Sequence, residues 1–264
     1  MRDIHIQADA YLAAHPELIE EVADSHRLDV PRSTGPAGLP SHTKLSVESL
    51  AMRELADGVW QLACFPPNSV NVYVLGDVLI DAGLAFDRRR ILRQVAGRGI
   101  TAHALTHAHL DHFGSSHAVC EYLGIPLWCG AADLPAVQAG RMVLHGGRTI
   151  PAARAHPVAR ALAEGDEVAG FVVLDTPGHS PGHVSYWRES GRVLVCGDVM
   201  WGYNPFLLKA GIREPYHWAS PDPERNRESA RRLAGLEPAL VCFGHGPPVR
   251  DPGAFTRAVQ RLGA

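Results

Sequence analysis

The sequence predicts an α/β (α+β) protein built as a four-layer sandwich of helices, sheet, sheet and helices. Short apolar strands alternate with helical segments from about residue 58, and the strand pattern begins again near residue 168. Two sheet-forming halves flanked by helices are typical of such a sandwich. Three predicted strands in the second half are each followed by a histidine or an aspartate that could bind metal, and rigid sheets commonly present functional side chains at strand ends.

Length and composition exclude several classes of partner. The 264 residues can bury a full core, and 46% are hydrophobic and 20% charged. With a net charge of −3 and no basic run, nucleic acid is not expected as a partner. No secretory signal and no apolar stretch of about 18 residues occurs, so a membrane is not expected. Five scattered cysteines without a C-x-x-C pair indicate reduced thiols and a cytoplasmic location.

Residues 1–50 are predicted to form an N-terminal helical appendage and linker, ahead of a main domain at 51–264. Residues 1 to about 30 have apolar side chains three to four apart, with Pro16 in a first-turn position. Residues 30–40 hold three prolines and two glycines, which indicates a linker. The appendage could pair subunits into a homodimer or cover the site, and the sequence does not choose between the two.

The main domain is predicted from its apolar runs. The expected strands are 59–64, 70–75, 78–81, 102–105, 126–129, 168–174, 184–187, 193–196 and 239–243. The expected helices are 87–96, 115–123, 131–139 and 224–233. The strands at 184–187 and 193–196 are expected to pair as a hairpin. Residues 140–165 are weakly patterned and rich in Arg, Ala and Pro, and they are expected to be an insertion.

The segment 106–112, Thr-His-Ala-His-Leu-Asp-His, follows a predicted buried strand and predicts a metal site. His107 and His109 are two residues apart, so in extended backbone their rings emerge on one side and can share an ion. Asp111 and His112 follow as the chain turns into a helix, where they could meet a second ion close by. Imidazole with carboxylate suits zinc, iron or manganese better than calcium or magnesium.

Four motifs give the chain a family resemblance: THAHLDH at 106–112, TPGHSPGH at 176–183, GD at 197–198 and GHG at 244–246. With these motifs in this order at strand ends, the chain resembles the metallo-β-lactamase superfamily of hydrolases. The resemblance extends from about Gly58 to the last residue. The resemblance implies the αββα sandwich of that superfamily. It also implies two divalent metal ions, with zinc expected and iron or manganese as alternatives.

The resemblance assigns the ligands residue by residue. The first ion would be held by His107, His109 and His179, the second by Asp111, His112 and His245, and Asp198 would bridge both. A hydroxide between the ions would attack an ester, lactone or thioester bond of a small, partly apolar substrate. Asp111 would also orient this nucleophile and shuttle its proton. The alternatives are a mononuclear iron dioxygenase of the persulfide type and a phosphodiester hydrolase.

The resemblance is to a branch similar to glyoxalase II and lactonases rather than to classical β-lactamases, and three departures from family patterns bear on the expected activity. Zinc β-lactamases that cleave antibiotics place cysteine where this chain has Asp198, so lactams are not the expected substrates. Lactonases use a tyrosine three residues after the bridging aspartate, where this chain has Trp201, with Tyr203 two residues later. Only 19 residues follow His245, fewer than the glutathione-gripping helical domain of glyoxalase II needs.

Further side chains are expected to support the ligands or to contact substrate. Asp81, at the end of a predicted strand, and His183 are expected to orient ligands rather than to bind metal. The aromatic segment after Asp198 is expected to form an apolar wall over the metals. The expected substrate contacts are Trp201, Tyr203, His217 and Phe65. An anchoring role for half or more of that segment is an open alternative.

Overall fold

The computed structural model describes residues 52–204 and 209–262. The predicted appendage at 1–50 lies outside these residues. The first sheet contains, in spatial order, β1 (Arg53–Ala56), β2 (Val59–Gln61), β3 (Tyr73–Leu75), β4 (Val78–Ile80), β5 (Ala102–Ala104), β6 (Leu127–Gly130) and β9 (Arg160–Leu162). The second contains β10 (Glu167–Val168), β11 (Phe171–Asp175), β12 (Val184–Arg188), β13 (Val193–Gly197) and β16 (Leu240–Phe243).

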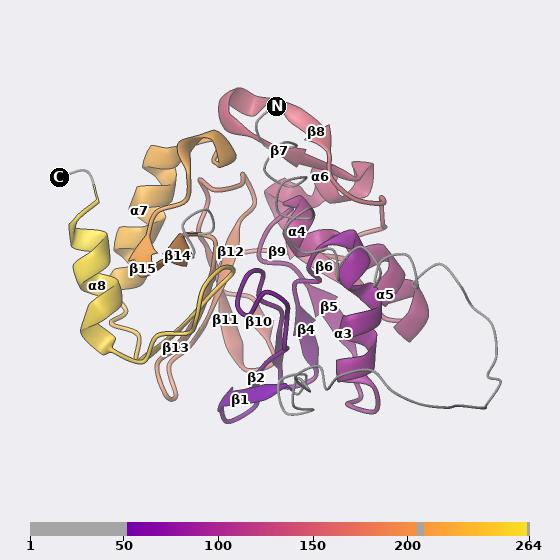
Figure 1. The fold of residues 1–264 in the computed structure, drawn as a ribbon. Coiled ribbons are helices and arrows are strands. Elements are labelled where there is room, and N and C mark those ends of the chain that lie inside the picture. The colour runs from indigo at the N-terminus through magenta and orange to yellow at the C-terminus, as the bar shows by residue number, and fades with distance from the viewer. Residues whose placement is uncertain (1–51, 205–208, 263–264) are drawn as a thin grey trace, which may run out of the picture. The chain divides into compact units, whose positions relative to one another are not determined.

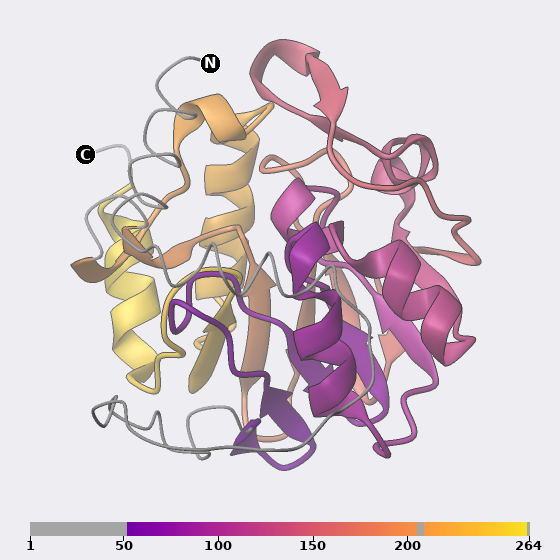
Figure 2. The same cartoon turned by 45° about the vertical axis from the view of Figure 1, so that its right-hand side comes forward.

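Helices cover the outer face of each sheet. On the first sheet they are α3 (Arg88–Val95), α4 (Leu110–Phe113), α5 (Ser116–Leu123) and α6 (Leu134–Ala139), and on the second α7 (Pro223–Ala234) and α8 (Pro252–Gln260). Figures 1 and 2 show α7 and α8 on the side opposite α3 and α5, with the strands between them. The predicted four-layer αββα sandwich is therefore confirmed. None of the helices in the described part has the length and apolar character needed to cross a bilayer.

Side-chain alternation assigns each strand residue to one of the apolar layers. In β4, Val78 and Ile80 pack between the two sheets, whereas Leu79 packs under the helices. In β13, Val195 faces the other sheet, whereas Leu194 packs against α7 and α8. Strands covered on both faces need apolar residues at every position. This is why the predicted strands appear in the sequence as continuous apolar runs.

The strand directions bring the functional segments to one edge of the two sheets. Strands β4, β5 and β6 are parallel, so the segments that follow them leave the first sheet at the same edge. In the second sheet β13 and β16 are parallel, and two antiparallel pairings give β11 the same direction. The Tyr186 hydroxyl donates to the carbonyl of Leu105 (2.7 Å) and the Tyr73 hydroxyl to that of Phe243 (2.7 Å), which ties the sheets together.

The structure departs from the sequence-based elements mainly outside the core. The predicted hairpin of β12 and β13 is confirmed. The predicted insertion at 140–165 contains the hairpin of β7 (Arg141–Val143) and β8 (Thr149–Pro151), and also β9, which pairs with β6. The aromatic segment after Asp198 includes the hairpin of β14 (Trp201–Asn204) and β15 (Lys209–Arg213). The sequence did not predict these two hairpins. They are partly exposed, so buried residues do not alternate regularly along their strands.

His103 in β5 is a core residue with both ring nitrogens engaged. Its Nδ1 lies 3.1 Å from the carbonyl oxygen of Leu79, and its Nε2 lies 2.8 Å from Ser116 Oγ. Nδ1 therefore donates, and Nε2 accepts from the serine hydroxyl. Burial lowers the pKa of His103 to about 4. The folded chain thus holds this ring neutral at pH values at which the unfolded chain protonates it.

We expect His103 to make the protein sensitive to acid. Because its folded pKa lies below the unfolded value of 6.5, stability falls as the pH drops from about 6.5 toward 4. Between pH 7 and pH 5 one such group accounts for about 2 kcal/mol. The H103Q variant should lose less stability than the wild type over this interval, as measured by urea denaturation at the two pH values. Equal losses in both proteins would contradict the assignment.

Candidate metal centre

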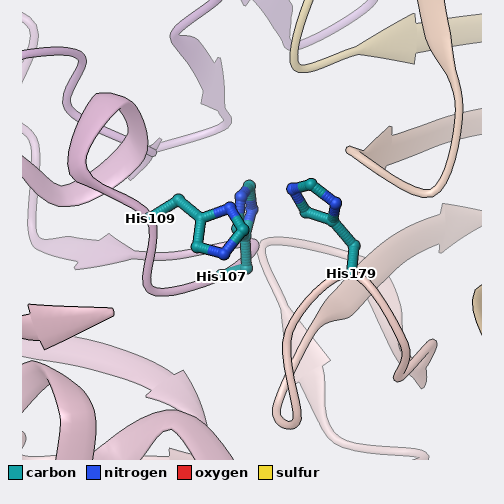
Figure 3. Close-up of side chains that lie close together, drawn as sticks. All are labelled: His107, His109 and His179. Atoms are coloured by element: carbon teal, nitrogen blue, oxygen red, sulfur yellow. The ribbon is translucent and has the colours of Figure 1, made fainter. Parts of the chain in front are cut away.

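The first cluster of candidate ligands contains three histidines from two loops. His107 and His109 follow β5, with His109 in extended backbone, and His179 lies in the loop that follows β11. The candidate ligand atoms of the three residues all lie within 4.8 Å of one another. Figure 3 shows the rings directed toward one another from the two loops. The structure brings together the three residues expected to hold one ion.

Neighbouring hydroxyls fix the orientation of two of these rings. Nδ1 of His107 lies 3.0 Å from Thr106 Oγ1, and Nδ1 of His179 lies 3.0 Å from Ser220 Oγ. The Nε2 atoms of His107 and His179 are buried and have no hydrogen-bond partner among the described residues. Each ring therefore directs its second nitrogen into the cluster, as metal-binding histidines do.

His109 is held through its other nitrogen. Its Nε2 lies 3.3 Å from the carbonyl oxygen of Val143, which can only accept, so Nε2 carries the proton and Nδ1 is available for an ion. Val143 belongs to β7, in the segment predicted as an insertion. This segment therefore fixes the tautomer of a candidate ligand, a function that the sequence did not indicate.

The second cluster contains Asp111, His112 and His245. The Nε2 atoms of His112 and His245 lie 3.4 Å apart, and Asp111 Oδ2 lies 3.2 Å from His245 Nε2. A tetrahedral ion with bonds of about 2.0 to 2.1 Å separates its ligand atoms by about 3.3 Å. The spacing therefore fits joint coordination of one ion. Nδ1 of His245 donates to the carbonyl oxygen of Ser69, which leaves Nε2 for the cluster.

Asp198 lies between the two clusters, directly after β13. Its Oδ2 is 3.4 Å from His179 Nε2 and 3.2 Å from His245 Nε2, while its Oδ1 is 3.6 Å from His112 Nε2. Its side chain is 2% exposed. A carboxylate in this position can contact a cation in either cluster. This is the arrangement that a bridging ligand requires.

Two histidines of the first cluster, His107 and His109, are neutral at physiological pH. Burial and the neighbouring imidazoles of His112 and His109 hold the pKa of His107 well below its usual range. Burial, followed by His179, lowers the pKa of His109 to about 3. Neutral imidazole is the form that binds a metal ion. Protons therefore do not compete for these rings near neutral pH.

When no ion is bound, protonated histidines in the second cluster balance the negative charge of the neighbouring carboxylates. Burial by itself would lower the pKa of His112, but Asp198, Asp111 and Asp81 raise it to about 10. Asp198, followed by Asp111, likewise raises the pKa of His245 well above its usual range, against the effect of burial. Burial by itself would raise the pKa of Asp198, but His245 and His112 hold it well below its usual range. A cation that replaces these protons preserves the charge balance, so binding here releases protons.

The donor atoms fit divalent cations. Five buried side-chain atoms of the described residues lack a hydrogen-bond partner, and three of them converge here: His107 Nε2, His179 Nε2 and Asp198 Oδ1. A buried polar atom without a partner is costly, so this concentration indicates that cations are their partners. Imidazole nitrogens with carboxylate oxygens are suitable for zinc, iron or manganese.

Asp81 and His183 lie where they can orient the ligands. Asp81 accepts hydrogen bonds from the backbone N–H (2.7 Å) and hydroxyl (2.8 Å) of Thr106, and its Oδ2 lies 2.8 Å from His112 Nδ1. Nδ1 of His183 lies 2.8 Å from Thr176 Oγ1, and its Nε2 accepts from the backbone N–H of Asp198 (3.1 Å). Both nitrogens of His183 are thus occupied, which fits a positioning role rather than direct metal binding.

The sequence analysis did not identify Asp133, which connects the loops of the first cluster. Its carboxylate accepts from the backbone N–H groups of Ala108 (2.9 Å) and Gly182 (2.7 Å) and from the hydroxyl of Ser180 (2.5 Å). Asp133 lies just after β6, at the edge that carries the other functional residues. Its place after a buried strand was the available signal.

Two glycines in the short motifs are required by close packing. A Cβ atom at Gly244 would lie 1.9 Å from Asp198 Oδ1. Gly197 has a φ of +52°, and its Cβ would lie 2.6 Å from His183 Nε2. Any side chain at either position would displace the central carboxylate or the ring that supports it. The motifs GD and GHG therefore combine a ligand with the space that it needs.

The four residues expected to contact substrate lie in different surroundings. Trp201 is 6% exposed, and its indole N–H donates to Asp198 Oδ2 (2.8 Å), so it supports a ligand directly. Tyr203 is half-buried on β14, and Phe65 is 58% exposed. His217 is exposed, with its ring near Glu214 and Arg227. Of these four, the structure brings Trp201 into contact with a candidate ligand.

The match to a family model covers residues 65–245, and the model describes the metallo-β-lactamase superfamily. This range contains all the candidate ligands of both clusters. The chain belongs to the metallo-β-lactamase superfamily. Membership confirms the predicted fold, and together with relatives named as metallo-hydrolases it confirms the predicted metal-dependent hydrolase.

Individual relatives agree with this assignment. The chain is 31% identical to "Probable metallo-hydrolase YflN" of Bacillus subtilis over 77% of this chain and 89% of the relative. It is 32% identical to a hydroxyacylglutathione hydrolase of Bdellovibrio bacteriovorus over 54% of this chain and 48% of that protein. Among solved structures it resembles TTHA1623 in a di-iron-bound form, with a TM-score of 0.56 and 32% identity over 73% of this chain and 94% of that one.

We expect the D81N variant to bind metal more weakly in the second cluster. The amide would present an N–H toward at least one of the donors that Asp81 now accepts from, so the orientation of His112 is lost. Removing such an orienting partner typically costs about 10- to 100-fold in metal affinity. The measurement is metal content per chain after dialysis against a graded chelator buffer.

The D77N variant is the matched control. Asp77 precedes the same strand, and its carboxylate accepts from the exposed hydroxyl of Thr101. Its metal content should equal that of the wild type at every chelator concentration. If D81N also retained metal like the wild type, the orienting role of Asp81 would be wrong.

Proposed function

We propose that the chain is a dinuclear hydrolase, with zinc as the expected metal and iron or manganese as alternatives. The observation that carries the proposal is the position of Asp198, whose carboxylate lies within 3.6 Å of nitrogens from both clusters. A shared carboxylate between two ligand clusters supports one ion in each. A solved relative in a di-iron-bound form also supports two ions.

The proposed substrate is a small molecule with an ester, lactone or thioester bond and an apolar part. Relatives named hydroxyacylglutathione hydrolase support the thioester, because an acylglutathione is a thioester. Aromatic side chains support the apolar part. Tyr216 and Trp218 stack with ring centroids 6.3 Å apart, Trp218 is 51% exposed, and Tyr216 packs against Trp201 at 5.5 Å. Phe65, Tyr203 and His217 remain proposed substrate contacts.

Two bound ions lower the pKa of water toward neutrality and stabilise negative charge in the transition state. Asp111 is the more exposed of the two candidate ligand carboxylates, at 27% against 2% for Asp198. Burial by itself would raise the pKa of Asp111, but His112 and His245 hold it well below its usual range. Asp111 is therefore ionised at neutral pH and can accept a hydrogen bond that orients the attacking water. Its role as a proton shuttle is part of the same proposal.

The proposal includes a cytoplasmic location. All five cysteines are free thiols in the structure. Unpaired cysteines are usual where thiols are kept reduced.

The activity is tested by metal analysis followed by a substrate panel. We expect two zinc ions per chain in the two clusters of the zinc-loaded protein, and hydrolysis of thioesters, esters or lactones by the zinc, iron and manganese forms. The substrates of the panel should share one acyl group and differ in the bond that is cleaved. The panel should also include a phosphodiester. One tightly held iron per chain with oxygen uptake would overturn the proposal, and turnover of the phosphodiester alone would replace its substrate class.

The bridging role is tested with the D198A variant. Removal of a carboxylate shared by both ions should abolish metal loading of the two clusters and lower turnover by at least about a thousandfold. The exposed turn residue Asp57 provides a control in D57A, which should retain both. Unchanged turnover in D198A would show that Asp198 does not bridge.

A further inference from the structure

A third group of potential metal ligands lies outside the two clusters described above. His117 and Glu121 are on α5, and His156 lies in the segment between β8 and β9. Their candidate ligand atoms all lie within 4.8 Å of one another. The group, here called the peripheral cluster, shares no residue with the strand-end clusters.

The spacing of the peripheral cluster is that of a chelating site. His117 and Glu121 are four residues apart on α5, so they lie on one face of the helix. The Nδ1 atoms of His117 and His156 lie 3.1 Å apart, with the ring planes at 78°. A tetrahedral ion with bonds of about 2.0 to 2.1 Å requires about 3.3 Å between ligand nitrogens. The two rings thus need to separate by only a few tenths of an ångström.

The third side chain can complete the site. Glu121 Oε1 lies 4.0 Å from His156 Nδ1, and its side chain is 65% exposed and can swing inward. His156 is 9% exposed, and burial together with the neighbouring His117 lowers its pKa. Its ring is therefore neutral near pH 7, with a lone pair available for an ion. Two imidazoles, one carboxylate and a water would give zinc four ligands.

We propose that His117, Glu121 and His156 bind a further divalent transition-metal ion of the zinc class. This ion would connect α5 to the segment that returns from the β7–β8 hairpin. The hairpin contacts the strand-end site, because the carbonyl of Val143 accepts from His109. The peripheral ion would therefore hold the segment that directly follows the hairpin carrying Val143.

The test counts metal ions in the full chain after removal of any purification tag. Wild type and variants are dialysed against zinc buffers of increasing free concentration, and bound zinc is measured by mass spectrometry. At a concentration that saturates the wild type, H117Q and H156Q should each bind one ion fewer. E121Q should bind the same number, with the last ion held at least about tenfold more weakly. The expected difference between the wild type and each histidine variant is one ion, whether the strand-end clusters together hold one ion or two.

A control and a second measurement separate this site from other histidines. The variant H145Q, changed in the turn between β7 and β8 and outside the peripheral cluster, should bind as many ions as the wild type. Zinc added after the strand-end site is filled should raise the melting temperature of the wild type but not that of H156Q. Equal zinc counts and equal melting shifts in wild type, H117Q and H156Q would overturn the proposal and leave His117 and His156 as a hydrogen-bonded pair.

Discussion

Asp198 holds a carboxylate that is 2% exposed at the point where the two sheets present their ligands. Removing an ionised carboxylate from water costs several kcal/mol unless other charges and donors replace the solvent. The surrounding structure supplies them: histidines from both clusters, the indole N–H of Trp201, and space made by Gly244. These contacts also fix where cations can bind. The need to stabilise one buried charge therefore determines much of the site.

The direction of the strands brings the groups that surround Asp198 to one edge of the two sheets. Parallel neighbours release the chain at a common edge, so residues far apart in sequence meet after one strand each. His107 follows β5, Asp198 follows β13 and His245 follows β16. The apolar layers beneath these strands keep the edge rigid, and hydrogen bonds such as that from Tyr186 to Leu105 hold the two edges in register. Ligand geometry is thus a property of the core as well as of the loops.

The parts of the fold and of the site that could be predicted from the sequence are those that depend on buried strands, which appear as continuous apolar runs. His179, Asp198 and His245 each follow an apolar run, and strand ends could therefore be located without a structure. Exposed elements gave no such signal: β9 is an edge strand of Arg160–Leu162 with a single buried residue, and its pairing depends on β6. The hydrogen bond from Trp201 to Asp198 depends on how β14 packs, which no local pattern encodes. The concentration of aromatic residues after Asp198 predicted an apolar wall over the metals, and the structure adds a hydrogen bond from this indole to a candidate ligand.

Four of the five cysteines are buried. Burial raises the pKa of Cys129 and Cys242 to about 12, and it raises that of Cys196 well above its usual range. Thiolates are the reactive form of cysteine and strong ligands for soft metals. Because these thiols stay protonated at neutral pH, they neither draw an ion away from the imidazoles nor react readily with peroxide. We therefore expect a chain stripped of metal in air to keep these buried thiols reduced.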